Sequence, residues 1–228
     1  MFLSGIRAVV LDAVGTLIYP DPPAPVLYSQ VGKRFGSRHD AEAIKSRFLQ
    51  AFEQEDQVDR GLGWRTSEER EIERWRHIVA RVLDDVSDPG ACFHTLFDHF
   101  SRPEAWRCAS DAGRVLTDLS ERDFVLGMAS NYDSRLRKVM AGKPELQSIE
   151  HVIISAEAGW RKPAAEFFAA VCRNVGLPAG QILVVGDDLV NDVQGAQSAG
   201  LRAVWYDQRD RKNSTVPIYI RQLSELVK

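Results

Sequence analysis

Hydrophobic residues gather in short continuous runs along this chain, and each run is followed by turn or polar residues. The clearest runs are Ala8–Leu11, Phe124–Ala129, Val152–Ser155 and Ile182–Val185, and Val204–Tyr206 is a further candidate. A strand that is apolar at nearly every position is buried on both faces, as in a parallel sheet covered by helices on both sides. The pattern therefore predicts an α/β fold with a parallel sheet.

Segments with helical spacing of apolar residues separate these runs. They are Ser110–Arg122, Ser134–Ala141, Ala164–Val175 and Asn191–Ala199. Regular alternation of strand and helix favours right-handed βαβ units. We therefore expect a doubly wound, Rossmann-like parallel sheet.

The region from residue 19 to residue 105 follows another pattern. It contains no strand-like run and is rich in charged residues at helical spacing, as in Ala41–Asp56 and Glu68–Val86. Prolines 20, 22, 23 and 25 predict a stiff, non-helical exit from the first strand. We interpret residues 19–105 as an inserted helical cap subdomain, and residues 1–18 and 106–228 as the α/β core.

Composition and charge narrow the class of partner. The 228 residues carry a formal net charge of −3, which predicts neither nucleic-acid binding nor attraction to an anionic membrane. The first apolar run is too short for a signal peptide, and there is no apolar window of the roughly 18 residues that a membrane span needs. The three cysteines form no Cys-x-x-Cys pair, which indicates reduced thiols. We predict a cytoplasmic protein that acts on a small molecule.

Polar residues stand at the end of each predicted strand. Asp12 follows the first strand, Ser130 and Asn131 the second, Arg161-Lys162-Pro163 comes after the third, and Gly186-Asp187-Asp188 ends the fourth. The carboxyl ends of parallel strands meet at one edge of the sheet, where ligands of such folds bind. Carboxylates brought together there repel one another unless a cation is present. The sequence thus predicts a site for a divalent cation such as Mg²⁺.

The residue types suggest individual roles. Asp12 is the candidate nucleophile, Ser130 a hydrogen-bond donor to an anionic substrate, and Lys162 the cation that offsets developing negative charge. Asp187 and Asp188 are oxygen ligands of the kind that Mg²⁺ prefers. Ser130 and Asn131 have a second possible role as helix caps, and Asp192 either supports Lys162 or the metal or merely solvates a helix.

Three neutral residues are candidates for substrate binding. Gly15 and Thr16 suit a turn whose backbone N–H groups approach an anionic group, and Asn131 offers a neutral amide. In the cap region, Trp64, Trp75 and Trp106 are interpreted as core or interface aromatics rather than as residues that stack on a substrate. Arg34, Arg38 and Arg47 are equal candidates for contact with a substrate anion.

Together these motifs resemble the four signature motifs of the haloacid dehalogenase (HAD) superfamily. They are Asp12-x-x-Gly15-Thr16-Leu17, Ser130-Asn131, Arg161-Lys162-Pro163 and Gly186-Asp187-Asp188-x-x-Asn191-Asp192. The helical region between the first two motifs is similar to the C1-type cap of that superfamily. The resemblance implies a hydrolase with Asp12 as nucleophile and Mg²⁺ held by Asp12, Asp187, Asp188 and the backbone carbonyl of Val14.

The first motif departs from the phosphatases of this superfamily, which generally read Asp-x-Asp. Their second Asp is the general acid and base, and its position is Val14 here. The 2-haloacid dehalogenases of the superfamily carry Asp-Ala-Tyr-Gly-Thr-Leu, which is similar to residues 12–17, and they use no metal. The fourth motif is phosphatase-like, because the dehalogenases have no paired aspartates there.

We therefore expect a Mg²⁺-dependent phosphatase of a small phosphorylated metabolite, which forms an aspartyl-phosphate at Asp12. The alternatives are a 2-haloacid dehalogenase and a catalytically weak or silent member that only binds a ligand. A phosphonatase is less favoured, because the candidate cap lysines, Lys33 and Lys45, stand in no motif.

Overall fold

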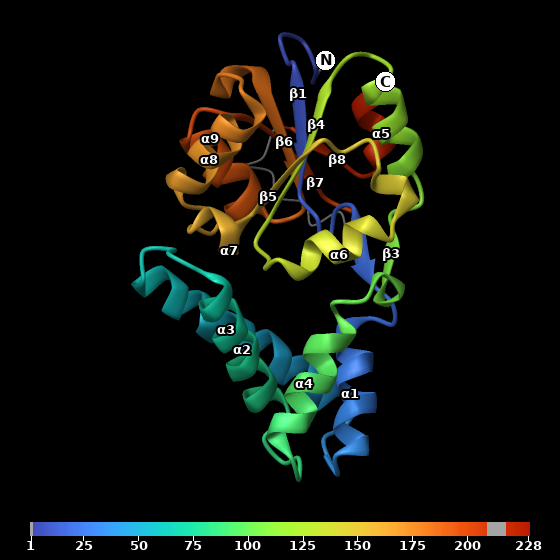
Figure 1. The fold of residues 1–228 in the computed structure, drawn as a ribbon, viewed down its shortest axis with the longest axis vertical. Helices are drawn as coiled ribbons and strands as arrows, with labels where there is room; N and C mark the ends of the chain where they lie inside the picture. The colour runs from blue at the N-terminus through green and yellow to red at the C-terminus, as the bar shows by residue number, and fades with distance from the viewer. Residues whose placement is uncertain (1, 209–217) are drawn as a thin grey trace.

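A computed structural model describes residues 2–208 and 218–228 (Figure 1). Its main element is a six-stranded sheet in the order β5-β4-β1-β6-β7-β8, in which every neighbouring pair is parallel. The strands are β1 Ala8–Leu11, β4 Val125–Ser130, β5 His151–Ile154, β6 Ile182–Gly186, β7 Arg202–Tyr206 and β8 Tyr219–Ile220. All five predicted strands are present, and the Rossmann-like α/β prediction is confirmed. The short edge strand β8 was not predicted.

Strand β1 shows why the sheet is covered on both faces. Val9 and Leu11 belong to a hydrophobic cluster that includes helix α5, whereas Ala8 and Val10 belong to a second cluster that includes helix α8. Successive side chains of a strand point to opposite faces, so both sets are buried only if helices lie on both sides. Figure 1 shows α8 and α9 on one side of the sheet and α5 on the other.

Four of the five helices between the strands are close to their predicted positions, whereas the fifth, Ser155–Ala158, was not predicted and begins at a residue that we expected to end a strand. They are α5 Ala112–Ser120, α6 Arg135–Ala141, α7 Ser155–Ala158, α8 Ala165–Val175 and α9 Gly195–Ser198, with short 3₁₀ turns at Pro103–Ala105, Pro144–Leu146, Ala179–Gln181 and Leu223–Val227. The predicted helix at Asn191–Ala199 begins as a π-helical turn, η4 Leu189–Gln194, and continues as α9.

Four helices lie between β1 and α5 in the chain and form what we call the helical insertion. They are α1 Ala24–Arg34, α2 Ala41–Gly61, α3 Glu68–Val82 and α4 Pro89–His99. Asp40 and Ser67 cap α2 and α3 by accepting hydrogen bonds from backbone N–H groups, as residues that begin helices commonly do. The four helices bury a hydrophobic cluster of their own. In Figure 1 they lie beyond the carboxyl ends of the strands.

Two features of this insertion were not predicted. Strands β2 Ile18–Pro20 and β3 Trp106–Cys108 form an antiparallel ribbon where the chain enters and leaves the insertion. Strands of three residues are too short to show a periodic pattern. Pro25 lies inside the first turn of α1, where a residue needs no backbone N–H donor and proline is tolerated. None of the helices in the described residues is both long and apolar enough to cross a bilayer.

Candidate active site

The candidate nucleophile Asp12 lies directly after the central strand β1. Its backbone N–H donates to the Val185 carbonyl at 2.8 Å, which continues the pairing of β1 with β6. Only 7% of Asp12 is exposed to solvent. The strand therefore delivers the carboxylate to the edge of the sheet in one orientation.

Lys162 reaches this carboxylate from the loop before α8. Its Nζ atom donates to Asp12 Oδ1 at 2.6 Å, to Asp192 Oδ1 at 2.5 Å and to the Ala129 carbonyl at 2.9 Å. These bonds use all three donors of a buried ammonium group. Burial disfavours the charged form, but the charges of Asp12 and Asp192 outweigh it and hold the pKa of Lys162 above its usual value.

Asn131, which we predicted to bind substrate, lines the cavity described below and also holds the backbone of Lys162. Its Nδ2 atom donates to the Lys162 carbonyl at 3.0 Å, and its Oδ1 atom accepts from the Lys162 N–H at 2.8 Å. This pair of bonds joins the end of β4 to the loop that carries the lysine. The neighbouring Ser130 is buried and lines the cavity described below, where a hydroxyl can meet a substrate.

The turn after Asp12 also differs from its predicted role. The N–H of Gly15 donates to the Ile18 carbonyl, and the N–H of Thr16 donates to the Ala13 carbonyl. The turn closes on itself, so these two N–H groups face backbone rather than the cavity, and neither residue lines it. The assignment of Gly15 and Thr16 to substrate binding stays a prediction, and these turn bonds do not favour it.

Gly15 has a different function, which depends on its missing side chain. Its φ angle of 97° is one that other residues rarely adopt, and a Cβ atom there would lie 2.5 Å from Asp187 Oδ1. In the same way, a Cβ atom at Gly186 would overlap the Asp192 carboxylate. The two glycines leave the space that lets these aspartates approach Asp12.

Three carboxylates meet as a result. Oxygen atoms of Asp12, Asp187 and Asp192 all lie within 4.8 Å of one another. Burial, together with the negative charges of Asp192 and Asp187, raises the pKa of Asp12 to about 8 in spite of the opposing charge of Lys162. Such a cluster fits a divalent cation, because oxygen ligands at this spacing suit Mg²⁺ and its charge would relieve the repulsion.

Asp188, which we predicted as a metal ligand, has another partner set. Its Oδ1 accepts from the N–H groups of Val190 and Asn191, and its Oδ2 accepts from the Asn191 side chain at 2.9 Å. It thus caps the turn η4, and that turn brings Asp192 toward Lys162. Among the described residues Asp192, rather than Asp188, completes the carboxylate cluster. The sequence contained a signal for this arrangement. Asp192 follows Asp188 by four residues, and one helical turn of that length brings the Asp192 side chain back toward the end of β6.

Val14, at the position where related phosphatases have their general acid, faces the cavity and is 36% exposed. Its side chain cannot transfer a proton. The cavity measures about 580 Å³ and extends from Asp12, Lys162 and Asp187 to the helical insertion.

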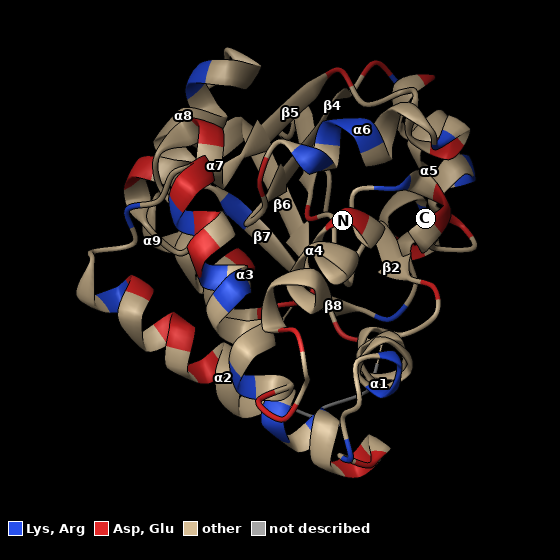
Figure 2. Cartoon of the chain, turned by 60° about the horizontal axis from the view of Figure 1, so that its bottom comes forward, with Lys and Arg blue, Asp and Glu red and all other residues tan. Residues whose placement is uncertain are grey.

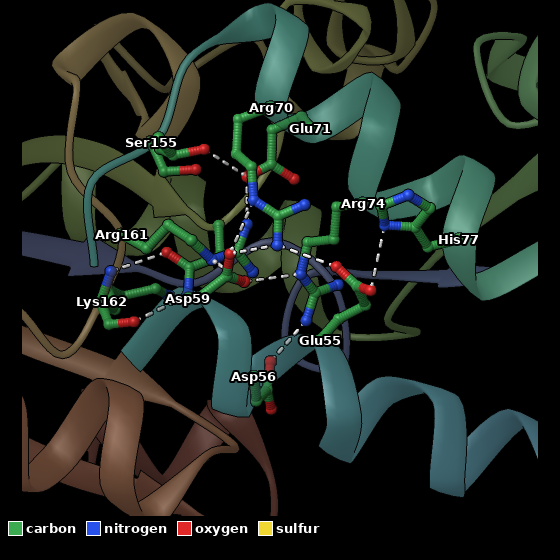
Figure 3. Close-up of polar contacts among 12 residues, drawn as sticks. Glu55, Asp56, Asp59, Arg70, Glu71, Arg74, His77, Ser155, Arg161 and Lys162 are labelled. Atoms are coloured by element: carbon green, nitrogen blue, oxygen red, sulfur yellow. Dashed lines mark hydrogen bonds and ion pairs between the residues drawn. The ribbon is translucent and has the colours of Figure 1, made fainter. Parts of the chain in front are cut away.

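A network of buried ion pairs connects the helical insertion to the loop that carries Lys162 (Figure 3). Arg161, the residue before Lys162, pairs with Glu71 of α3 and with Asp59 of α2, the latter at 3.4 Å. Its backbone N–H also donates to the Trp64 carbonyl at 2.8 Å. Within the insertion, Arg70 and Arg74 both donate to Asp59.

We had predicted neither this network nor its arginines. The arginines that line the cavity are Arg74, Arg135 and Arg161. The candidates Arg34, Arg38 and Arg47 do not line it, and Arg47 binds backbone carbonyls at the end of α3 and Asp84 instead. Trp75 and Trp106, which we interpreted as core residues, do line the cavity.

Comparison with known proteins gives a consistent result. A family model described as haloacid dehalogenase-like hydrolase matches residues 6–200, a range that includes all four motifs. The chain is 23% identical over 218 residues to haloacid dehalogenase-like hydrolase domain-containing protein 3 of Danio rerio, covering 93% of this chain and 90% of that protein. It is 27% identical over 221 residues to a ribulose-1,5-bisphosphate 5-phosphatase of Halopiger xanaduensis, covering 91% and 87%.

A solved structure supports the fold. The putative HAD-hydrolase YfnB from Bacillus subtilis, in a form bound to magnesium, superposes with a TM-score of 0.77 at 20% identity. The superposition covers 97% of this chain and 96% of that one.

Proposed function

The chain belongs to the haloacid dehalogenase-like hydrolase family, and from that premise we propose that it is a Mg²⁺-dependent phosphatase of a small phosphorylated metabolite. The observation that carries this proposal is the meeting of Asp12, Asp187 and Asp192 in one cavity, with Lys162 bonded to the first and the last of them. A metal-independent reaction has no need for two further carboxylates beside the nucleophile, where they would repel an anionic substrate.

The proposed reaction begins with attack of an Asp12 carboxylate oxygen on phosphorus. A bond forms between Asp12 and phosphorus, the bond to the ester oxygen breaks, and the alkoxide takes a proton from water because Val14 has none to give. Lys162 offsets negative charge beside Asp12, and the Ser130 hydroxyl donates to a phosphoryl oxygen. Water then hydrolyses the aspartyl-phosphate and regenerates Asp12.

We propose that Mg²⁺ is held by Asp12, Asp187, Asp192 and the backbone carbonyl of Val14, with Asp192 in place of Asp188. When bound, the ion supplies positive charge against the phosphoryl oxygens. The relative from Halopiger xanaduensis carries the name of a phosphatase, which supports phosphoryl chemistry at this site. We further propose that the helical insertion is the cap of the active site, with the boundaries expected from the sequence.

Val14 favours a second candidate function, a 2-haloacid dehalogenase. A halide leaves without a proton, so a site without a general acid does not hinder it. In that reaction Asp12 displaces halide at carbon, and water hydrolyses the resulting ester.

A panel of phosphate monoesters and 2-haloacids, each assayed with Mg²⁺ or with EDTA, tests the proposal. We expect phosphate release with Mg²⁺ only, and we expect Asp12→Asn to lower it by about 10³-fold or more, as loss of a nucleophile does. Asp98→Asn, an exposed aspartate on α4, is the matched control and retains activity. Halide release in EDTA would favour the dehalogenase, activity in neither series would favour a binding protein, and turnover by Asp12→Asn would exclude the covalent route.

A further inference from the structure

The part of the cavity beyond Asp12 is lined mainly by aromatic side chains. One group comes from the helical insertion and another from the ribbon and the end of β4: Tyr28, Phe48, Phe52, Trp75, Phe93, Phe97, Phe100, Trp106 and Tyr132. Because these rings share one cavity with Asp12 and Lys162, a substrate whose phosphate meets Asp12 can place its other end among them.

The rings on α1, α2 and α3 form a continuous wall. Ring centroids are 5.1 Å apart for Tyr28 and Phe48, 5.0 Å for Phe48 and Phe52, and 5.5 Å for Phe52 and Trp75. Phe48, Phe52 and Trp75 are partly exposed, so this wall is not a closed core. When an apolar ligand covers aromatic surface that faces a cavity, the free energy of the complex falls.

The cations of the cavity are already neutralised. Arg74 pairs with Asp56 and Asp59, and Arg135 pairs with Asp133 at 2.7 Å. Arg161 and Lys162 are engaged by the carboxylates described above. Among the described residues, every Lys or Arg that lines the cavity therefore has a carboxylate partner.

The charged residues along the helices of the insertion are also mixed in sign. Basic and acidic residues are interspersed along α2 and α3 (Figure 2). A second phosphate or carboxylate on the substrate would compete for these arginines with carboxylates that are mostly buried, and a displaced buried carboxylate would lose its partner.

We propose that the preferred substrate is the phosphate monoester of an apolar alcohol that carries an aromatic or similarly bulky group and no second anionic group. This inference rests on the proposed phosphatase function and names its substrate class. The cavity of about 580 Å³ accommodates a leaving group of the size of a bicyclic ring. A sugar would place several hydroxyl groups against the faces of Phe48 and Phe52, which offer them no hydrogen bond.

Three esters of primary alcohols test the proposal with matched leaving-group reactivity. They are 2-(1-naphthyl)ethyl phosphate, ribose 5-phosphate and ribulose 1,5-bisphosphate, assayed with Mg²⁺. We expect kcat/KM for the naphthylethyl ester to exceed that for either sugar ester by about 10- to 100-fold, the range that burial of one aromatic group allows. A higher kcat/KM for either sugar ester would overturn the inference and leave the phosphatase proposal intact.

Variants of the wall locate the effect. Trp75→Ala should lower kcat/KM for the naphthylethyl ester by about tenfold, chiefly through KM, because it removes ring contacts made in the ground state and the transition state alike. Leu49→Ala is the matched control, since Leu49 lies on α2 but is 63% exposed and does not line the cavity. An equal loss in both variants would contradict the role of the wall.

Binding of the free alcohol gives a measurement that needs neither catalysis nor a variant. We expect 2-(1-naphthyl)ethanol to bind the wild-type protein in calorimetry with a negative heat-capacity change, and ribose to show no binding. Absence of alcohol binding would overturn the inference. Alcohol binding without turnover of any phosphate ester would retain the apolar cavity and reject the phosphatase function, so the two failures are distinguishable.

Discussion

Two neighbouring clusters of charged side chains in this protein differ in the ratio of positive to negative groups. The cluster at the strand ends combines three carboxylates with one ammonium group: Asp12, Asp187, Asp192 and Lys162. The network between the insertion and the core combines four carboxylates with four guanidinium groups: Glu55, Asp56, Asp59, Glu71, Arg70, Arg74, Arg81 and Arg161. Arg161 and Lys162 are adjacent, so the chain connects the two directly.

Burial is followed by opposite net shifts of the pKa in the two places. Burial raises the pKa of Glu55, but hydrogen bonds from Arg81 and Arg70 outweigh it, and the pKa lies below its usual value. Burial also raises the pKa of Asp12, and there the neighbouring aspartates add to it, so that it reaches about 8. The number of opposite charges nearby therefore distinguishes a cluster suited to a cation from one that joins two parts of the fold.

The largest expected effect is on the balanced network. Asp59→Asn keeps the shape of the side chain but removes the charge that pairs with Arg70, Arg74 and Arg161. Breaking a buried pair from one side costs about 3–5 kcal/mol, which denaturant unfolding would measure.

Asp56→Asn is the control for this experiment. Asp56 also pairs with Arg74, but its side chain is 46% exposed, so its loss should cost about 1 kcal/mol or less. Equal losses in the two variants would mean that the network is not distinguished by its burial.

A smaller effect, on turnover, is expected when a carboxyl group is added beside the three aspartates at the strand ends. Val14→Asp adds a carboxyl group at the open edge of the cavity, where it can protonate the leaving alkoxide. We expect turnover of a phosphate ester to rise by about 10- to 100-fold, near the lower end of what general acid–base catalysis supplies. Steady-state kinetics with Mg²⁺ would measure it.

Val190→Asp gives the matched comparison, because Val190 also lines the cavity and is 50% exposed but lies beyond Asp188. It should give no such rise. If both variants or neither increased turnover, the missing acid would not be what limits this enzyme.

The smallest effect is expected from reducing the unbalanced cluster. Asp187→Asn removes one of three like charges, so the metal-free protein should gain up to about 1 kcal/mol of stability, the reverse of the Asp59→Asn result. The rise in Tm that Mg²⁺ produces in the wild type should disappear, because that rise depends on binding to the folded state. Thermal unfolding with Mg²⁺ or EDTA would measure both.

Asp188→Asn tests whether the neighbouring carboxylate also binds Mg²⁺. It should weaken the cap of η4 by up to about 1 kcal/mol and leave the Mg²⁺-dependent rise in Tm in place. Loss of that rise in Asp188→Asn would restore Asp188 as a metal ligand.

Local patterns were sufficient for most of the α/β core. The strands β1, β4, β5 and β6 are apolar and bounded by turns, so their positions and the polar groups at their ends were predictable. The ribbon β2–β3 and the strand β8 were not, because strands of two or three residues carry no period. Helix α1 was missed because its prolines indicated a break, whereas one of them lies in a first turn that tolerates it.

Among the site residues too, some contacts were predictable from local patterns and others were not. The meeting of Asp12 with Lys162 follows from parallel strands, whose carboxyl ends share an edge. The choice between Asp188 and Asp192 depends on how the turn η4 rotates each side chain, and the bonds of Asn131 to Lys162 depend on a loop 31 residues away.

By itself, the sequence determined the family, the parallel sheet, the helical insertion and the set of polar residues at the strand ends, since each is written in local periodicity or in contiguous motifs. Only the tertiary structure decided which aspartates meet, which glycines make room for them, how the arginines are paired and that aromatic rings line the cavity. Those features depend on distances between side chains far apart in the chain, and a one-dimensional pattern does not contain such distances.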